Sequence, residues 1–302
     1  MESKDRVLGV FLDTIKIPAH AYKQLLKRKA VDMCKIKGFT LIELLVVISI
    51  IALLMSILMP ALQRVKKQTK VVVCQSNLRQ WGTIYFMYLD DNDNYFNRSS
   101  YGTSNWESFW MNALQSYYKD SKLRCCPAAT KPWTEGGQGT FSAWGVMGED
   151  WYDFDWRAGE GLYGSYAENS WICDPQKRED PVSSLAPRKN HWKRSDVKAG
   201  GSIPLVLDSW WFDGYPKDSD APPEYDCQRE AAGSNQMRRY SINRHVGLIN
   251  SSFMDFSVRK VGLKELWTLK WHREFNMGGF WTKAGGALPE DWPEWMRPFR
   301  DY

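Results

Sequence analysis

Histidine and aspartate residues in the C-terminal third are the first candidates for chemistry in this chain. His245 and Asp255 are separated by nine residues, and Asp208 ends an earlier apolar run. An imidazole beside a carboxylate can act as a general base, provided that the two side chains come within hydrogen-bond reach. If the chain from His245 to Asp255 were a straight strand, however, the two would lie roughly 30 Å apart. They meet only if the residues before Leu248 fold back.

No second motif supports an enzyme. The sequence contains no nucleophile elbow, HExxH zinc motif or phosphate-binding loop. We therefore expect no catalytic residues, and a structural role for His245 and Asp255, such as tying together the edge of a sheet. Two alternatives are an extracytoplasmic hydrolase, which would join His245 to a carboxylate, and a metal shared by Asp208 and Asp255.

A run of Asp and Asn at residues 90–94 is a further candidate for a cation site. Calcium prefers oxygen ligands, which Asp90 and Asn92 can supply. Tyr95, however, stands where a calcium-binding EF-hand loop needs glycine. A solvated turn that ends a helix is the preferred interpretation. We expect no cofactor, with calcium as the alternative.

A long apolar segment near the N-terminus positions everything that follows. Nineteen apolar or small residues separate Glu43 from Gln63. About 20 such residues span the ~30 Å hydrocarbon core of a membrane, so residues 39–62 can cross it as one helix. Apolar residues at three- and four-residue spacing extend this helix to about Leu89. We expect its second half to pack under a head, and residues 63–302 form this head together with that half of the helix. Pro60 is expected to kink the helix without ending it.

The net charge of the chain is concentrated before this apolar segment. Residues 1–38 carry nine Lys or Arg and four Asp or Glu, whereas the remainder carries 31 of each sign. A neutral remainder argues against nucleic acid as a partner, because phosphate binding needs a clustered positive surface. The basic start instead follows the positive-inside rule, which places the N-terminus in the cytoplasm and the chain after Arg64 across the inner membrane.

On that side of the membrane the cysteines face an oxidising space. Five cysteines follow the apolar segment: Cys74, Cys125, Cys126, Cys173 and Cys227. Adjacent cysteines rarely bridge each other, so we expect Cys74 to pair with Cys125 or Cys126. Cys173 and Cys227 are the other expected pair, which leaves one thiol over. The sequence has no Cys-x-x-Cys or paired-histidine spacing that would indicate zinc.

The stretch Lys37-Gly38-Phe39-Thr40-Leu41-Ile42-Glu43 resembles the processing site of type IV prepilins and type II secretion pseudopilins. The resemblance implies that a prepilin peptidase cuts after Gly38 and methylates the new terminus, Phe39. It also implies that Glu43 neutralises the α-amino group of a neighbouring subunit in a helical filament. Pro60 lies 22 residues after the cleavage point, where these pilins commonly carry a helix-kinking proline.

Residues 1–38 are the leader that this resemblance implies. Met33 would give an ordinary six-residue leader, so translation from Met33 is an equal alternative. A secretory signal fits less well, because its apolar region is usually about 7–15 residues long and ends in a small-residue site. An uncleaved single-pass anchor is the remaining alternative.

The head adds matches to one subgroup of bacterial prepilin-like proteins. Residues 74–96 resemble its Cys-x-x-Asn-Leu-x-Gln stretch, Cys126-Pro127 matches its Cys-Pro, and His245 with Asp255 matches its C-terminal His-x9-Asp-Gly motif. The resemblance implies an α+β pilin-like fold: a long kinked helix packed on a small antiparallel β-sheet head with irregular insertions. Phe256 replaces the glycine of the motif. Glycine accepts a positive φ at low cost and phenylalanine does not, so the sequence leaves the type of turn in the predicted hairpin undetermined.

The remaining elements are predicted from apolar spacing and turn residues. Strands are expected from residue 164, at 202–208, at 248–254 and at 257–261. Short helices are expected at 106–118 and 263–272, and the Gly- and Pro-rich tail after residue 278 is expected to be loosely structured.

The expected function is that of a pilin-like structural subunit of a type II secretion pseudopilus or type IV pilus-like filament. The partners that the resemblance implies are other pilin-like subunits, the prepilin peptidase and methyltransferase, and an inner-membrane assembly platform. Sixteen tryptophans keep a second hypothesis open, a membrane-anchored glycan-binding protein that uses the prepilin signal for export. Packing in the core and between subunits is the preferred role for these aromatic side chains.

Overall fold

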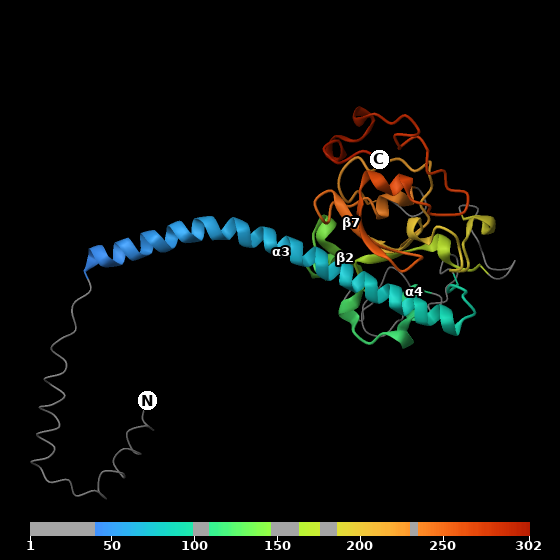
Figure 1. Ribbon diagram of the computed structural model, residues 1–302, viewed down its shortest axis with the longest axis horizontal. Helices are drawn as coiled ribbons and strands as arrows, with labels where there is room; N and C mark the ends of the chain where they lie inside the picture. The colour runs from blue at the N-terminus through green and yellow to red at the C-terminus, as the bar shows by residue number, and fades with distance from the viewer. Residues whose placement is uncertain (1–39, 99–108, 146–162, 176–185, 230–234) are drawn as a thin grey trace, which may run out of the picture. The chain divides into compact units, whose positions relative to one another are not determined.

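The computed structural model describes residues 40–98, 109–145, 163–175, 186–229 and 235–302 (Figure 1). Gly38, Phe39 and the rest of the predicted leader lie outside these residues, as does the start of the helix predicted at 106–118. The chain divides into two compact units, residues 1–62 and residues 63–302.

Helix α3 (Leu41–Asp91) contributes to both units and agrees with the helix predicted for residues 39–89. Within the first unit, its large apolar side chains are 45–79% exposed. A continuous apolar surface of this kind is stable only against lipid or another apolar surface. By length and composition α3 is able to cross a membrane, and it continues without interruption through Pro60.

The head is built on a five-stranded sheet with the strand order β6-β4-β5-β7-β8. Its strands are β4 (Tyr166–Asn169), β5 (Pro204–Asp208), β6 (Asp213–Gly214), β7 (Leu248–Phe253) and β8 (Val258–Gly262). All neighbours are antiparallel except β6, which runs parallel to β4. A smaller sheet contains β1 (Lys131–Pro132), β2 (Ser142–Gly145) and β3 (Tyr163–Gly164). The α+β pilin-like fold is therefore confirmed.

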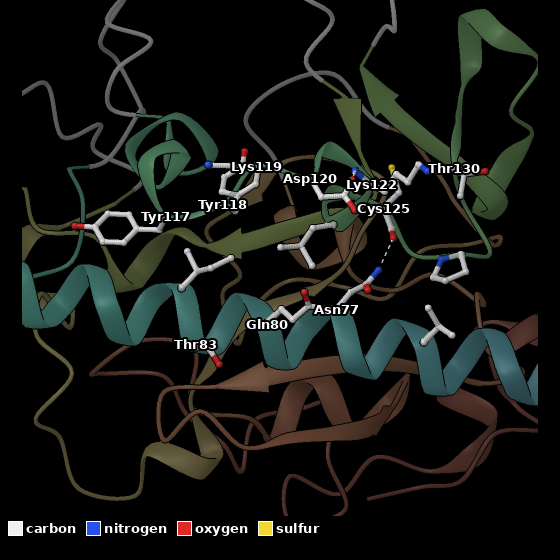
Figure 2. Close-up of a pocket in the computed structure, with 14 residues that line it drawn as sticks. Asn77, Gln80, Thr83, Tyr117, Tyr118, Lys119, Asp120, Lys122, Cys125 and Thr130 are labelled. Carbon is white, nitrogen blue, oxygen red and sulfur yellow. Dashed lines mark hydrogen bonds between the residues drawn. The ribbon is translucent and has the colours of Figure 1, made fainter.

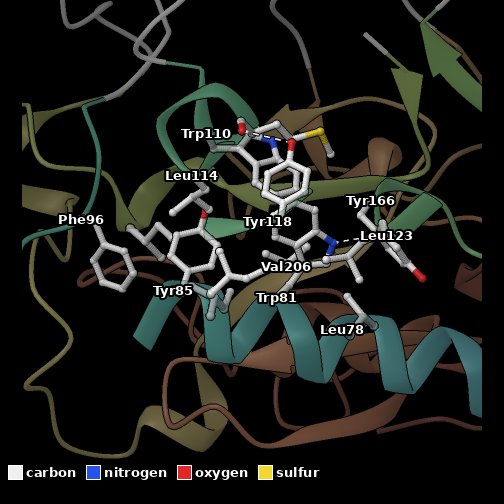
Figure 3. Packing of buried hydrophobic residues seen from close by; sticks show 14 of the residues in the cluster. Leu78, Trp81, Tyr85, Phe96, Trp110, Leu114, Tyr118, Leu123, Tyr166 and Val206 are labelled. Carbon is white, nitrogen blue, oxygen red and sulfur yellow. Dashed lines mark hydrogen bonds between the residues drawn. The ribbon is translucent and has the colours of Figure 1, made fainter. Parts of the chain in front are cut away.

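One stripe of α3 holds the helix to the head. Leu78, Trp81 and Tyr85 follow each other at three- and four-residue spacing and are buried, as this spacing on a helix requires. The Trp81 indole donates a hydrogen bond to the Leu123 carbonyl at 3.0 Å, and its ring meets Trp110 with the centroids 4.8 Å apart. Figure 3 shows these rings packed above α3. Because each large aromatic side chain buries roughly 150–250 Å², this stripe supplies much of the contact area.

The β7–β8 turn resolves the question that Phe256 raised. Phe256 adopts the left-handed conformation, with φ of 62°, that glycine would adopt there, and its N–H donates to the Phe253 carbonyl at 2.8 Å. Its ring packs edge-on against Phe86 of α3, and its backbone approaches Gly82 closely. The contact with the helix offsets the roughly 1–2 kcal/mol that a left-handed residue with a Cβ costs.

The predictions for the two short helices and the tail need correction. The helix predicted at 106–118 is a short α4 (Trp110–Ala113) followed by one 3₁₀ turn, and residues 263–272 contain a single 3₁₀ turn, Lys264–Thr268. The tail is packed, not loose, because its Trp292 and Met296 are buried. Trp292 meets Trp267 edge-on with the centroids 5.3 Å apart. Glycine and proline do predict irregular backbone here, but the aromatic side chains between them fill a second apolar core.

A buried carboxylate links β4 to α3. The Tyr85 hydroxyl donates to Glu168 Oε1 at 2.6 Å, and the Cys173 thiol donates to Oε2 at 3.3 Å. Burial raises the pKa of Glu168 from 4.5 to about 7, even though these hydrogen bonds act in the opposite direction. The folded protein therefore binds a proton between pH 4.5 and 7 that the unfolded chain has lost. Since the native state binds more protons, stability from this group falls as the pH rises through that window.

We expect Glu168→Gln to remove this contribution. The amide oxygen of glutamine still accepts from Tyr85 but carries no charge. A pKa rise from 4.5 to about 7 corresponds to up to ~3 kcal/mol of stability. Between pH 4.5 and 7.5 the free energy of unfolding of wild type should therefore fall by about that much relative to the variant. Urea unfolding of the full-length chain in mild detergent, followed by near-UV circular dichroism, measures this difference. Burial lowers the pKa of His191 and His272 to about 4, so their contribution to stability rises with pH, opposite to that of Glu168. Wild type and variant share both histidines, so this contribution cancels in the difference between them. Parallel pH profiles would contradict the prediction.

Candidate functional site

The described part of the N-terminal motif forms the first turn of α3. The backbone N–H of Thr40 donates to Glu43 Oε2 at 2.9 Å, and the Thr40 hydroxyl donates to the same oxygen at 2.7 Å. In return, the Glu43 N–H donates to Thr40 Oγ1 at 3.2 Å. This reciprocal pair is a capping box, which satisfies N–H groups that a helix start leaves without partners.

The capping box gives Glu43 a role that was not predicted, although Thr-x-x-Glu before an apolar run is its signature. A carboxylate near the start of a membrane span is costly unless it is paired. In the single chain Thr40 supplies that pairing, and the positive end of the helix dipole favours the negative charge. Glu43 is therefore held in a defined position at the start of an exposed apolar helix.

A second group of reactive side chains meets inside the head. Cys74 of α3, Cys126, Asp208 at the end of β5 and His245 before β7 are all buried, and one ligand atom from each lies within 4.8 Å of the others. His245 Nε2 lies 3.2 Å from Asp208 Oδ2 and 3.4 Å from Cys126 Sγ. The Cys74 thiol lies 3.5 Å from Asp208 Oδ2. We call these four residues the buried cluster.

The backbone just before β7 explains why His245 reaches this cluster. Val246 and Gly247 both have positive φ, 58° and 77°, and the His245 N–H donates to the Leu248 carbonyl at 3.0 Å. A positive φ at a β-branched residue such as Val246 is a genuine outlier, and strain of this kind is retained where the surroundings enforce it. The chain folds back, as a site containing His245 requires, but it carries the imidazole to Asp208 and not to Asp255.

Asp255 lies at the other end of the hairpin. Its Oδ1 accepts hydrogen bonds from the Ser257 N–H at 3.0 Å and the Ser257 hydroxyl at 2.6 Å, within the β7–β8 turn. In the pairing of β5 with β7, Pro204 lies opposite Phe253, whereas Asp208 lies beyond the other end of this pairing. The structure therefore contradicts a metal shared by Asp208 and Asp255, and a base-and-carboxylate pair of His245 with Asp255.

Arg244 closes the buried cluster from one side. Its fully buried guanidinium donates to Asp208 Oδ1 at 3.2 Å, and it also donates to backbone carbonyls of Thr140, Ser165 and Ser209 at 2.6–3.0 Å. Burial alone would raise the pKa of Asp208, but the hydrogen bond and charge of His245 and the charge of Arg244 hold it at about 2. Asp208 is thus a carboxylate in the folded protein.

The two thiols of the cluster differ in acidity. Burial raises the pKa of Cys74 well above its usual value. Burial also acts to raise the pKa of Cys126, but hydrogen bonds from Cys74 and His245 outweigh it and bring this pKa to about 7. The pKa of His245 is about 9, because Asp208 and Cys126 favour the imidazolium more than burial opposes it. The cluster therefore presents soft sulfur, imidazole and carboxylate donors to one another, away from solvent.

The other cysteines correct part of the disulfide prediction. All five cysteines of the described chain are free and buried. Cys74 does lie beside one of the adjacent pair, Cys126. Cys173 instead donates to Glu168 and belongs to the apolar cluster around α3, whereas Cys227 belongs to the one under the C-terminal tail. Both thiols are free and belong to separate apolar clusters, so the expected Cys173–Cys227 bridge is not confirmed.

A groove of about 580 Å³ runs beside α3, and Figure 2 shows its lining. The Asn77 amide donates to the Cys125 carbonyl across it at 3.0 Å. No histidine is among its lining residues, and its one carboxylate, Asp120, accepts from the Lys122 N–H as a helix cap. None of the buried-cluster residues lines it. The groove is therefore separate from the buried cluster.

The acidic run after α3 forms a turn. The Asn92 side chain donates to the Tyr88 carbonyl at 2.7 Å, and Asp93 and Asn94 adopt left-handed φ of 52° and 63°. Side-chain bonding of this kind ends a helix without any ion. Calcium binding by Asp90 and Asn92, the alternative to the expected absence of a cofactor, stays untested.

The tryptophans bear on the glycan-binding hypothesis. Trp106, Trp151 and Trp156 lie outside the described residues. Of the tryptophans that the structure describes, only Trp133 is mostly exposed, at 64%, and the Arg229 guanidinium covers its ring at 5.0 Å. A sugar platform needs free aromatic faces, so these side chains favour packing over glycan recognition.

Comparisons with known proteins fall on the N-terminal segment. The family described as "Prokaryotic N-terminal methylation motif" matches residues 33–59. Over 59 residues the chain is 44% identical to the type IV wide pilus major component PilA4 of Thermus thermophilus. That alignment covers 20% of this chain and 45% of PilA4, so the chain spans less than half the length of this relative. No solved structure gives a significant match.

The motif and the geometry agree on the same segment. The matched family ends at residue 59, inside the exposed apolar part of α3, and the capping box with Glu43 lies within it. The head adds the α+β arrangement that a pilin places behind such a helix. The chain is a type IV prepilin- or pseudopilin-like protein.

Proposed function

We propose that this protein is a subunit of a pilus-like filament, cleaved after Gly38 and methylated on Phe39 before assembly. The observation that carries the proposal is the exposed apolar part of α3, which begins at a capped glutamate and has no covering partner among the described residues. In the membrane, lipid covers this surface. In a filament, the same surface of neighbouring subunits covers it, as packing of apolar helices against each other allows.

The charge distribution supports the orientation of the precursor. By the positive-inside rule, the excess of basic residues before residue 39 favours a cytoplasmic N-terminus, with the head on the far side of the inner membrane. A prepilin peptidase with methyltransferase activity and an inner-membrane assembly platform are then the expected partners. The three histidines that the structure describes are buried, which favours a structural subunit over an enzyme, and both a type II secretion pseudopilus and a type IV pilus fit this role.

Mass analysis of the mature chain tests the processing step. We expect the wild-type protein from its native host to start at N-methylated Phe39, because the peptidase of this class cuts after the glycine of the motif. Gly38→Val should leave the full precursor uncut, since a β-branched side chain replaces the small residue at the cleavage point. The same substitution at Gly9, inside the leader, is the matched control and should not affect cleavage. A wild-type chain that keeps its leader would contradict the proposal.

A further inference from the structure

We propose that the buried cluster of Cys74, Cys126, Asp208 and His245 is a structural binding site for a zinc ion. The four side chains come from four separate segments of the head: α3, the loop after residue 124, the end of β5 and the turn before β7. Their residue types are the zinc ligands of proteins, and four protein ligands with no exposed position characterise structural sites. Zinc would therefore tie these four segments to one another.

Three distances between the ligand atoms match the edges of a zinc tetrahedron. With Zn–S of about 2.3 Å and Zn–N or Zn–O of about 2.0–2.2 Å, tetrahedral ligands lie about 3.4 Å apart for N···O and about 3.6 Å for S···N and S···O. The structure has 3.2 Å between His245 Nε2 and Asp208 Oδ2, and 3.4 Å between His245 Nε2 and Cys126 Sγ. Cys74 Sγ lies 3.5 Å from Asp208 Oδ2. These three edges fit ligands around one centre, and all four ligand atoms lie within 4.8 Å of one another.

Protons satisfy this arrangement less well than a cation does. His245 Nε2 faces both Cys126 Sγ and Asp208 Oδ2, but a ring nitrogen carries a single hydrogen and can direct it at only one acceptor. The Cys74 thiol lies between the two oxygens of Asp208 in the same way, at 3.6 and 3.5 Å. A metal ion accepts all four donors at once.

The charges around the cluster also balance with zinc present. Two thiolates and one carboxylate carry three negative charges, and the zinc ion and the buried Arg244 guanidinium together carry three positive charges. Buried charges need such compensation. The Tyr166 hydroxyl donates to Cys74 Sγ at 3.3 Å, and the Asn250 N–H donates to Asp208 Oδ2 at 2.9 Å. Hydrogen bonds from outside a metal site orient its ligands in this way.

Metal titration of the full-length chain in mild detergent tests the site. After reduction and removal of metals with a chelator, the chain should bind one equivalent of Zn²⁺. Co²⁺ in its place should give the visible bands of tetrahedral cobalt and a sulfur-to-cobalt charge-transfer band in the near ultraviolet, with the intensity of two thiolates. This readout on the wild-type protein does not depend on any variant folding. A cobalt spectrum without the charge-transfer band would overturn the proposal.

Two cysteine variants complete the test. Cys126→Ser should lose stoichiometric zinc binding and, at the same cobalt concentration, most of the charge-transfer band. Cys125→Ser, which changes the adjacent buried cysteine outside the cluster, should leave both unchanged. Circular dichroism establishes that each variant is folded. A Cys74–Cys126 disulfide in the native protein, with no zinc uptake after its reduction, would overturn the proposal, as would equal cobalt spectra for the two variants. The outcome does not depend on whether the chain assembles into filaments.

Discussion

Replacing Glu43 by alanine is expected to abolish filament assembly while leaving the chain in the membrane. In the proposed filament, the Glu43 carboxylate neutralises the α-amino group of Phe39 on a neighbouring subunit within an apolar environment. Removing one partner of a buried ion pair typically costs ~3–5 kcal/mol, which is a loss of roughly 10²–10³ or more in each subunit contact. Sedimentation of sheared filaments measures assembly, and membrane fractionation measures insertion.

The capping box makes a sharper version of this experiment possible. Glutamine is also accepted at the third helical position of a capping box, so Glu43→Gln keeps the cap formed with Thr40 and removes only the charge. If the charge guides docking, both variants fail to assemble. Ser49→Ala, in the same apolar segment, removes a hydroxyl that, among the described residues, bonds to the Val46 carbonyl of its own helix, and should assemble normally. Normal filaments from Glu43→Gln would show that the cap, not the charge, is the required feature.

The sequence was sufficient to predict the parts of the fold that depend on local pattern. An uninterrupted apolar run followed by three- and four-residue spacing predicts α3 almost to its ends. Short apolar runs between turn residues predict β5, β7 and β8 within one or two residues. These elements are recognisable because their own residues determine both the period and the buried face.

The buried cluster was not predictable in this way, because its members come from four segments far apart in the chain. Metal-ligand spacing is recognisable in a sequence only when ligands share a turn or a helix, as in Cys-x-x-Cys. The His-x9-Asp motif directed attention to Asp255, which shares a hairpin with His245. His245 reaches its actual partner, Asp208, because the backbone at Val246 is left-handed. A valine in the sequence does not indicate that conformation. Two expectations nevertheless pointed toward the site: Asp208 ends an apolar run, and Cys74 was expected to lie beside Cys125 or Cys126.

The C-terminal tail shows a different limit. Its glycines and prolines correctly predict a backbone without long helices or strands, yet its Trp292 lies against Trp267 in a closed core. Irregular backbone and loose packing are separate properties. The first is readable from local residues, whereas the second depends on whether an apolar surface elsewhere is left for the tail to cover.

Replacing Arg244 by methionine is expected to destabilise the head by ~3–5 kcal/mol, even when no metal is bound. Methionine fills much of the volume of arginine, but it leaves the Asp208 carboxylate without its guanidinium partner. It also leaves the carbonyls of Thr140 and Ser209 without a donor. Each buried acceptor that loses its partner costs ~1–3 kcal/mol, and a buried charge costs more. Urea unfolding in the presence of a chelator measures the loss without any contribution from metal binding.

Arg194 provides the control, because it forms a two-point pair with Asp196 at 2.9 and 3.1 Å on the surface, closer than the 3.2 Å contact of Arg244 with Asp208. Water solvates both partners there, so Arg194→Met should cost no more than about 1 kcal/mol. Arg244→Lys should fall between the two, since a lysine keeps the charge but cannot reach three backbone segments and a carboxylate with one planar group. Similar losses for Arg244→Met and Arg194→Met would mean that the guanidinium does not hold these segments together. A large difference would establish Arg244 as the side chain that joins β5 to the loops around the buried cluster.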